Sequence, residues 1–133
     1  MPEAWADSTT ANVKTKSATV KKIEAIIRPE KVEDVRKAIE AVGYPGITIT
    51  EAEGHGKQKG VVQQWRGETY RVEFLPKVKL EIVVSESDVE RIIQAIIKTA
   101  RTNGGAVGDG KIFVSDIRDV IKIRTGERGE SAI

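Results

Sequence analysis

Two amphipathic segments of similar sequence constrain the fold of this chain more than any other feature. In each segment apolar residues recur at spacings of three and four, which is the periodicity of a helix with one buried face. The two segments even read alike, Val32-Glu-Asp-Val-Arg-Lys-Ala-Ile39 beside Val89-Glu-Arg-Ile-Ile-Gln-Ala-Ile96. We therefore predict two helices, the first bounded by Pro29 and Gly43 and the second starting within residues 85–88.

Strand-like segments precede and follow each predicted helix. Runs rich in Val and Ile occupy residues 20–27, 47–52, 77–84 and 111–117, and a further run follows at 120–124. The order predicts an α+β domain of the ferredoxin-like βαββαβ type, with a long loop between strands 2 and 3 and both helices on one face of an antiparallel sheet. The other face still carries apolar residues, so we expect the chain to form an oligomer through that face.

Composition excludes several kinds of site. The 133 residues include no cysteine and one histidine, His55, which excludes disulfides, thiolate catalysis and metal sites built from Cys or several His. The apolar runs are too short for a transmembrane helix, so we expect a cytoplasmic protein. A net charge of +2 gives no argument for nucleic-acid binding.

The chain divides into a short head and one domain. Residues 1–19 are polar and without apolar periodicity, which predicts a flexible N-terminal extension; a targeting peptide is the alternative. Residues 20–133 are expected to form a single domain. Within it, residues 54–74 contain four glycines and many polar side chains, and a loop of this length inside a compact domain is often functional.

Two glycine-spaced, cationic segments point to an anionic ligand. Closely spaced glycines in Gly108-Asp-Gly-Lys111 let backbone N–H groups converge on an anion, and Gly54-His-Gly-Lys-Gln-Lys-Gly60 has a similar character. Lys122 and Arg124 are two residues apart and would share one face of a strand. Each signal alone also fits a solvated turn or strand, but together they favour a polyphosphate or carboxylate ligand.

Neither catalysis nor nucleic-acid binding finds support in the residues. No pair of acid and base groups lies in an apolar segment, and the serines lack an elbow motif or a histidine partner, so we do not expect an enzyme. Residues 112–117 resemble the shorter strand signature of RNA-recognition motifs, but the companion strand with its stacking aromatics is missing.

Five motifs in order resemble the PII signal-transduction proteins of nitrogen metabolism. The resemblance runs from about Lys21 to Ile133, and its motifs are Lys22-Ile-Glu-Ala-Ile-Ile-Arg-Pro29, Gly56-Lys-Gln-Lys-Gly60, Phe74-Leu-Pro-Lys-Val-Lys-Leu-Glu-Ile-Val83, Gly108-Asp-Gly-Lys-Ile-Phe-Val114 and Ile123-Arg-Thr-Gly126. It implies a homotrimer of ferredoxin-like subunits with clefts between neighbours that bind ATP or ADP. The implied function is a nitrogen regulatory signal protein that senses ATP, ADP and 2-oxoglutarate.

The resemblance also implies which residues bind these ligands. Adenine and ribose contacts would fall on Ile26, Gly46, Ile47, Thr48, Glu81 and Val83. Phosphate contacts would fall on Gly54, Gly56, Lys57, Gln58, Gly108, Asp109, Gly110 and Lys111, with Lys122 and Arg124 reaching across from the neighbouring subunit. Beside ATP, Gln58 would complete the Mg²⁺ shell, and 2-oxoglutarate would lie against Gln58, Lys59, Gly60 and Lys77.

Residues 54–74 correspond to the family's T-loop, the arm that docks partners. Arg66 matches the residue that contacts an ammonium channel, so the expected partner is such a channel or a nitrogen-metabolism enzyme, with a membrane approached only through the channel. Tyr70 aligns with a tyrosine that some members have uridylylated. The segment 102–108 is two residues longer than is usual in the family, and Lys122 replaces a commoner Arg.

A second interpretation of the same sequence stays open. The chain could be a ferredoxin-like oligomeric binding module, for nucleic acid or protein, whose nucleotide cleft is vestigial. A third, ATP hydrolysis as the main activity, lacks a positioned base.

Overall fold

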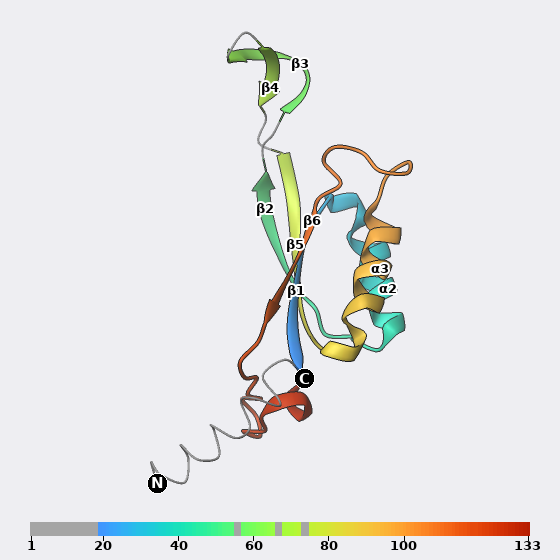
Figure 1. Cartoon of the computed structure of the whole chain (residues 1–133), viewed down its shortest axis with the longest axis vertical. Coiled ribbons are helices and arrows are strands. Elements are labelled where there is room, and N and C mark those ends of the chain that lie inside the picture. The colour runs from blue at the N-terminus through green and yellow to red at the C-terminus, as the bar shows by residue number, and fades with distance from the viewer. Residues whose placement is uncertain (1–18, 55–56, 66–67, 73–74) are drawn as a thin grey trace.

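The computed structural model describes residues 19–54, 57–65, 68–72 and 75–133 (Figure 1). The predicted extension at 1–19 therefore lies almost wholly outside the described residues. The main elements, in chain order, are β1 (Val20–Ile27), α2 (Val32–Val42), β2 (Thr48–Gly54), β3 (Lys57–Trp65), β4 (Glu68–Val72), β5 (Leu75–Ser85), α3 (Val89–Ala100) and β6 (Lys111–Asp116). Two short 3₁₀ turns lead into the helices, η1 (Pro29–Lys31) into α2 and η2 (Glu86–Asp88) into α3. A third, η3 (Gly129–Ala132), lies near the C-terminus.

The main sheet has four antiparallel strands in the order β2-β5-β1-β6. Its two central strands come from opposite halves of the chain, and β1 pairs with β5 on one side and β6 on the other. Both helices lie against the same face of the sheet (Figure 1). This is the ferredoxin-like α+β arrangement that the helix and strand order predicts.

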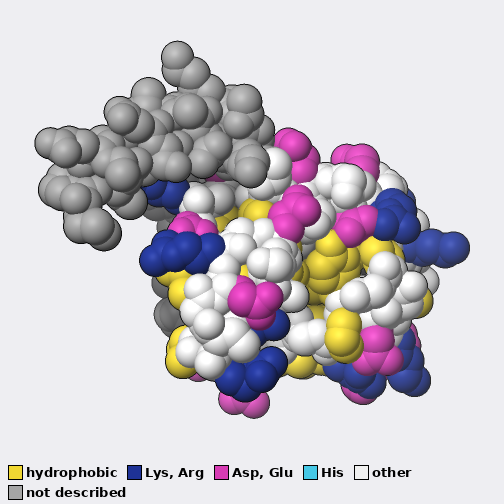
Figure 2. All heavy atoms as spheres, turned by 90° about the horizontal axis from the view of Figure 1, so that it is seen from below, with side chains coloured by type: hydrophobic (Ala, Val, Ile, Leu, Met, Phe, Trp, Pro, Cys, Tyr) yellow, Lys and Arg dark blue, Asp and Glu magenta, His cyan; other side chains and the backbone are white. Residues whose placement is uncertain are grey.

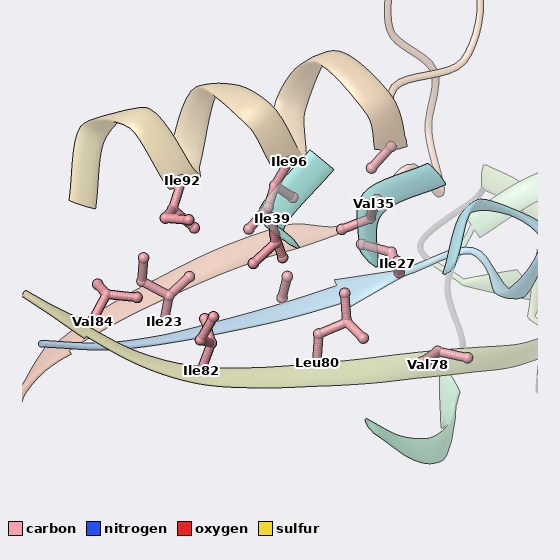
Figure 3. Packing of buried hydrophobic residues seen from close by; sticks show 12 residues of the cluster. Ile23, Ile27, Val35, Ile39, Val78, Leu80, Ile82, Val84, Ile92 and Ile96 are labelled. Atoms are coloured by element: carbon pink, nitrogen blue, oxygen red, sulfur yellow. The ribbon is translucent and has the colours of Figure 1, made fainter. Parts of the chain in front are cut away.

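The core lies between that face and the helices. Alternate residues of β1 and β5 point into it, as period-2 strand geometry requires, and Figure 3 shows them facing residues from both helices. Its members are Ile23, Ala25, Ile27, Val35, Ile39, Val78, Leu80, Ile82, Val84, Ile92, Ile96 and Ala100. Burying one such large aliphatic side chain contributes about 1.5–3 kcal/mol, so this layer fixes how the two halves pack.

The open face of the sheet mixes charges with apolar side chains. At its centre, Lys22 and Lys79 lie close to Glu24 and Glu81, and the shortest of these contacts joins Lys22 Nζ to Glu81 Oε2 at 2.7 Å. Phe113, opposite Glu24 in the register, is 52% exposed. The open face therefore carries an exposed apolar side chain, as predicted, together with four charged side chains at its centre.

Charges of both signs also alternate at the end of the molecule that carries the C-terminal segment. Figure 2 shows Lys and Arg side chains interspersed with Asp and Glu there, with hydrophobic side chains between them. Contact with the phosphate backbone of a nucleic acid favours a uniformly basic surface, and this surface is not one.

Two segments differ from the sequence predictions. The stretch 57–72, expected as loop, contains the β3–β4 hairpin, which projects beyond the end of the sheet where β2 stops and β5 begins (Figure 1). The strand expected at 120–124 is wrong, because the backbone there turns: Gly126 N donates to Lys122 O at 2.7 Å, and one isolated bridge joins Ile121 to Arg128. Lys122 and Arg124 therefore do not share the face of a strand.

Candidate functional site

A glycine-rich loop at one end of the sheet carries the predicted anion-binding motif. Residues 101–110 connect α3 to β6 and lie at the same end as the β3–β4 hairpin (Figure 1). Gly104, Gly105, Gly108 and Gly110 all have positive φ, from +79° to +117°, and Asn103 has φ +44°. These are backbone conformations that L side chains adopt at a cost, which explains the density of glycine.

Gly110 sets the loop against β1. A Cβ atom at this position would lie 1.7 Å from the carbonyl oxygen of Ile26, so no side chain fits without moving the backbone. Lys111, the next residue, pairs with Ile26 in the β1–β6 register. The start of β6 and the end of β1 are thereby held in contact.

Asp109 is enclosed by donors. Its Oδ1 accepts hydrogen bonds from Thr102 Oγ1 at 2.6 Å and Arg28 Nε at 3.1 Å, and its Oδ2 accepts from the backbone N–H groups of Thr102 at 3.0 Å and Ala106 at 2.8 Å. The hydroxyl of Thr102, helped by the two N–H groups and the guanidinium, holds the pKa of Asp109 well below its usual range. The side chain is 17% exposed. Its carboxylate thus organises the loop, and the phosphate contact expected of Asp109 from the sequence stays a prediction.

Two cations bind carbonyl oxygens of the same loop. Arg28 Nη2 donates to Val107 O at 3.0 Å, and Lys77 Nζ donates to Gly108 O at 2.7 Å. The sequence predicts Lys77 near the anionic ligands, and the structure places it on the loop. Arg28 and Thr102 are not predicted from the sequence as parts of the site. The Arg-Pro pair at the end of β1 predicts only the end of a strand. The same proline keeps the backbone of Arg28 extended beside the loop.

A hollow of about 320 Å³ lies over β5 and the start of β2. It is lined by Lys22, Gly46, Thr48, Glu81, Ile82 and Val83. Four of the six residues expected to contact adenine and ribose therefore meet in one place. The Lys22 ammonium lowers the pKa of the Glu81 carboxyl through its hydrogen bond, so the hollow contains an ionised acid.

Ile26 and Ile47 do not line that hollow. Ile26 is paired with Lys111 on one side and Lys79 on the other, so it lies beside Lys111, one of the residues expected to contact phosphate. A second hollow, of about 380 Å³, runs between α3 and β6; it is mainly apolar and includes Asp109, Gly110 and Lys111 at one end.

Within one chain the two sets of predicted residues stay apart. Thr48 belongs to the edge strand β2 and Lys111 to the opposite edge strand β6, and β5 and β1 lie between them. Three strand spacings separate the edges by about 14 Å. Lys122 and Arg124 belong to the C-terminal segment, which lies at the end of the sheet opposite the glycine-rich loop (Figure 1), and Lys122 Nζ is 3.6 Å from Glu127 Oε1.

Several predicted residues lie outside this description. Gly56 and Arg66 are not among the described residues, and for Gly54, Lys57, Gln58, Lys59, Gly60 and Tyr70 the structure describes only the backbone, in β2, β3 and β4. Among the described residues, no three His, Asp or Glu side chains are grouped so as to hold a metal ion. No helix in the described part of the chain is long and apolar enough to cross a membrane.

The fold and the loop define a ferredoxin-like domain with a glycine-rich turn before β6 and a projecting hairpin. The family described as "Nitrogen regulatory protein P-II" matches residues 20–127, and the chain belongs to this family. It is 50% identical over 114 residues to "Nitrogen regulatory protein P-II 2" of Methanothermobacter thermautotrophicus, covering 86% of this chain and 97% of that one. It is 56% identical to "Nitrogen regulatory protein P-II" of Bradyrhizobium diazoefficiens, covering 86% and 100%. The resemblance drawn from the sequence motifs is thereby confirmed, and the chain is a nitrogen regulatory signal protein.

Solved structures of the family share the fold. Arabidopsis thaliana PII bound to citrate superposes with a TM-score of 0.70 at 40% identity, covering 86% of this chain and 90% of that one. The Bacillus subtilis GlnK–ATP complex superposes with a TM-score of 0.72 at 30% identity, covering 90% and 100%. The predicted ferredoxin-like fold is confirmed.

Replacing Gly110 with alanine should destabilise the protein by about 1–3 kcal/mol, the usual cost of forcing atoms into a packed site. The added methyl would overlap Ile26 O, and φ +113° is unfavourable for alanine. Urea denaturation at one protein concentration measures the change. Gly46→Ala is the matched control, because nothing lies within 4 Å of the added Cβ; equal stability of the two variants would contradict the role assigned to Gly110.

The stabilisation provided by Asp109 should depend on pH. The folded-state pKa of Asp109 is lowered, so its contribution is complete above the ordinary carboxyl pKa of about 4 and is lost as the pH falls below that value. At pH 7, Asp109→Asn should lower the free energy of unfolding by about 1.5–3 kcal/mol, as for hydrogen bonds to a charged group. Denaturation of parent and variant between pH 7 and pH 3 should show this difference shrinking, whereas Asp34→Asn on the exposed surface of α2 should change little throughout.

Proposed function

We propose that this protein binds ATP or ADP in clefts between the subunits of a homotrimer and senses 2-oxoglutarate together with Mg-ATP. Through residues 54–74 it then controls an ammonium channel or a nitrogen-metabolism enzyme in the cytoplasm, as a regulator rather than an enzyme. The observation that carries the proposal is the ordered glycine-rich loop 101–110, with Lys77 and Lys111 beside it. The ATP complex of Bacillus subtilis GlnK, a relative of the same fold, supports it.

The separation of the two half-sites supports a site shared between subunits. The hollow with Thr48 and Glu81 lies toward the β2 edge, and Lys111 lies on the β6 edge, so one nucleotide joins them most simply where the β2 edge of one subunit meets the β6 edge of the next. Both edges expose apolar side chains: Ile49 in β2 and Val114 in β6 are each 45% exposed. Ile123, between Lys122 and Arg124, is 100% exposed, as a segment that packs on a neighbouring subunit would be.

The chemistry at the loop suits phosphate. Backbone N–H groups of Gly108 and Gly110 and the ammonium of Lys111 would bind phosphate oxygens, and Lys122 and Arg124 would approach from the neighbouring subunit. A Mg²⁺ ion would be held mainly by phosphate oxygens, with Gln58 completing its shell. A bound Mg²⁺ would neutralise charge and so let a second anion occupy the same cleft.

The position of Lys77 suits a carboxylate effector. Its ammonium already lies at the mouth of the loop, and β5 carries it directly beside the base of the hairpin, where Gly54 pairs with Leu75. We assign 2-oxoglutarate to Lys77, Gln58, Lys59 and Gly60. The citrate-bound structure of Arabidopsis thaliana PII shows that a relative of this fold holds a small polycarboxylate.

The projecting hairpin is assigned to partner docking. It extends beyond the sheet with its backbone away from the core, so a partner can reach it without disturbing the fold (Figure 1). We assign the central contact to Arg66, since arginine is among the residues most enriched at interface hot spots. Tyr70, in β4 of the same hairpin, is the candidate for covalent modification.

Lys111→Ala and Arg124→Ala should each weaken ATP binding by about 1.5–3 kcal/mol, the contribution of a hydrogen bond to a charged group. Calorimetry measures the affinity, and light scattering checks that the trimer persists. Lys98→Ala, on the exposed surface of α3, is the matched control and should bind ATP as the parent does. Because Lys111 and Arg124 would come from different subunits, trimers mixed from the two variants should keep some intact sites.

The same calorimetry tests the rest of the proposal. 2-Oxoglutarate should bind only when ATP and Mg²⁺ are present. Absence of ATP binding by the parent protein would instead support the vestigial-cleft interpretation, and a stable monomer would remove the shared cleft.

Arg66→Ala should abolish capture of the channel or enzyme partner while ATP affinity and the trimer stay unchanged. Pull-down with purified candidate partners measures capture, with ADP in one arm and ATP, Mg²⁺ and 2-oxoglutarate in the other. The complex should form with ADP and dissociate with the three effectors. Undiminished capture by the variant would show that the hairpin is not the docking arm.

A further inference from the structure

The carboxylate of Asp109 has no hydrogen-bonding capacity left over for a ligand. Each of its oxygens accepts two hydrogen bonds, Oδ1 from the Thr102 hydroxyl and Arg28, and Oδ2 from two backbone N–H groups. The N–H of Asp109 itself donates to Ala106 O at 3.1 Å. All these partners belong to the loop or to the residue that follows β1.

Without these bonds, ordering the loop would be unfavourable because of the conformational entropy of its backbone. Glycines at 104, 105, 108 and 110 lie within seven consecutive residues and all have positive φ. Fixing each backbone unit costs conformational entropy, and glycine loses the most. If the loop were disordered before binding, this entropy would be lost on binding and the affinity for the ligand would be lower.

Arg28 ties the ordered loop to the sheet. The residue follows β1 directly, and Pro29 keeps its backbone extended, at φ −68° and ψ 140°. From there its guanidinium binds Asp109 through Nε and Val107 O through Nη2. The absent side chain of Gly108 makes room for this, because a Cβ there would lie 3.0 Å from Arg28 Nη2.

These bonds also determine where a loop N–H points. The peptide unit between Val107 and Gly108 is trans and planar, so its N–H points opposite to its carbonyl. Since the Val107 carbonyl is held by Arg28, the N–H of Gly108 is turned away from the guanidinium. The loop therefore presents this donor in a fixed direction in the absence of any ligand.

We infer that Asp109, held by Thr102 and Arg28, is a positioning residue that fixes the glycine-rich loop in its anion-binding shape before nucleotide arrives. Asp109 acts on the nucleotide through the loop backbone and does not touch the phosphates. The inference rests on the nucleotide site proposed above. Thr102, at the far end of the loop, then contributes to ATP binding without contacting the nucleotide.

Variants at Thr102 separate positioning from contact. Thr102→Val removes the hydroxyl donor to Asp109 but keeps the shape of the side chain and the backbone N–H, and Thr102→Ser restores the hydroxyl. Thr99→Val is the matched control: its hydroxyl lies three residues earlier on α3 and donates to the helix carbonyl of Ala95 at 2.7 Å. Lys111→Ala serves as the comparison for a contact residue.

Two measurements are made on each full-length variant: amide hydrogen exchange of residues 101–111 without nucleotide, and ATP affinity by calorimetry. Thr102→Val should exchange faster in this segment and bind ATP about tenfold more weakly, as expected for losing a hydrogen bond to a charged group. Thr102→Ser and Thr99→Val should match the parent. Lys111→Ala should weaken ATP binding with exchange unchanged.

The outcomes decide between roles. Unchanged ATP affinity in Thr102→Val, or weaker binding with unchanged exchange, would overturn the inference. Failure of Thr102→Ser to restore both properties would also overturn it. If the parent bound no ATP, the proposed function would fail, while the ordering of the loop by Asp109 would stand or fall on the exchange rates alone.

Discussion

The pairing of β1 with β5 on one side and β6 on the other determines which residues enter the core and where the glycine-rich loop is anchored. Because side chains alternate along a strand, this one register sends Ile23, Ala25 and Ile27 into the core and Lys22 and Glu24 to the open face. A slip by one residue would exchange these two sets. The same strand ends just before Arg28, so the register that fixes the core also fixes where the glycine-rich loop can be anchored.

The half-sites follow from the edges of that sheet. β1 and β5 occupy the centre, which leaves β2 and β6 as edges about 14 Å apart, each with backbone groups and exposed apolar side chains available to a neighbour. The centre of the open face is occupied by the charges of Lys22, Glu24, Lys79 and Glu81, which satisfy one another. The nucleotide site that we propose at a junction of these edges would need no opening in the core, and binding there would couple the ligand to assembly.

Sequence periodicity is sufficient to predict the core of the fold and insufficient for its ends. The helices and the four sheet strands are predictable because each buries one face, and burial dictates the spacing of apolar residues. The segment 120–124 alternates in the same way yet turns. The β3–β4 hairpin also forms where the sequence of residues 57–65 gives no run of alternating apolar residues. Glycine spacing likewise predicts the turn at 108–111, but not the role of Asp109. Its partners are Thr102, seven residues earlier, and Arg28, at the end of another strand, and they depend on the folded path of the loop, which no local pattern contains.

The two residues by which segment 102–108 is expected to exceed the family's usual length fall in the part of the loop that the carboxylate of Asp109 holds. This carboxylate holds Thr102, where the loop leaves α3, and Ala106, after the first two glycines, so additional residues between these points can bulge outward without moving Gly110 and Lys111. Those two residues are fixed independently, because Gly110 abuts Ile26 and Lys111 enters the β1–β6 register. The residues that we propose to bind the anion are thus attached to the sheet, while variation in length falls on the part of the loop that a carboxylate can hold at both ends.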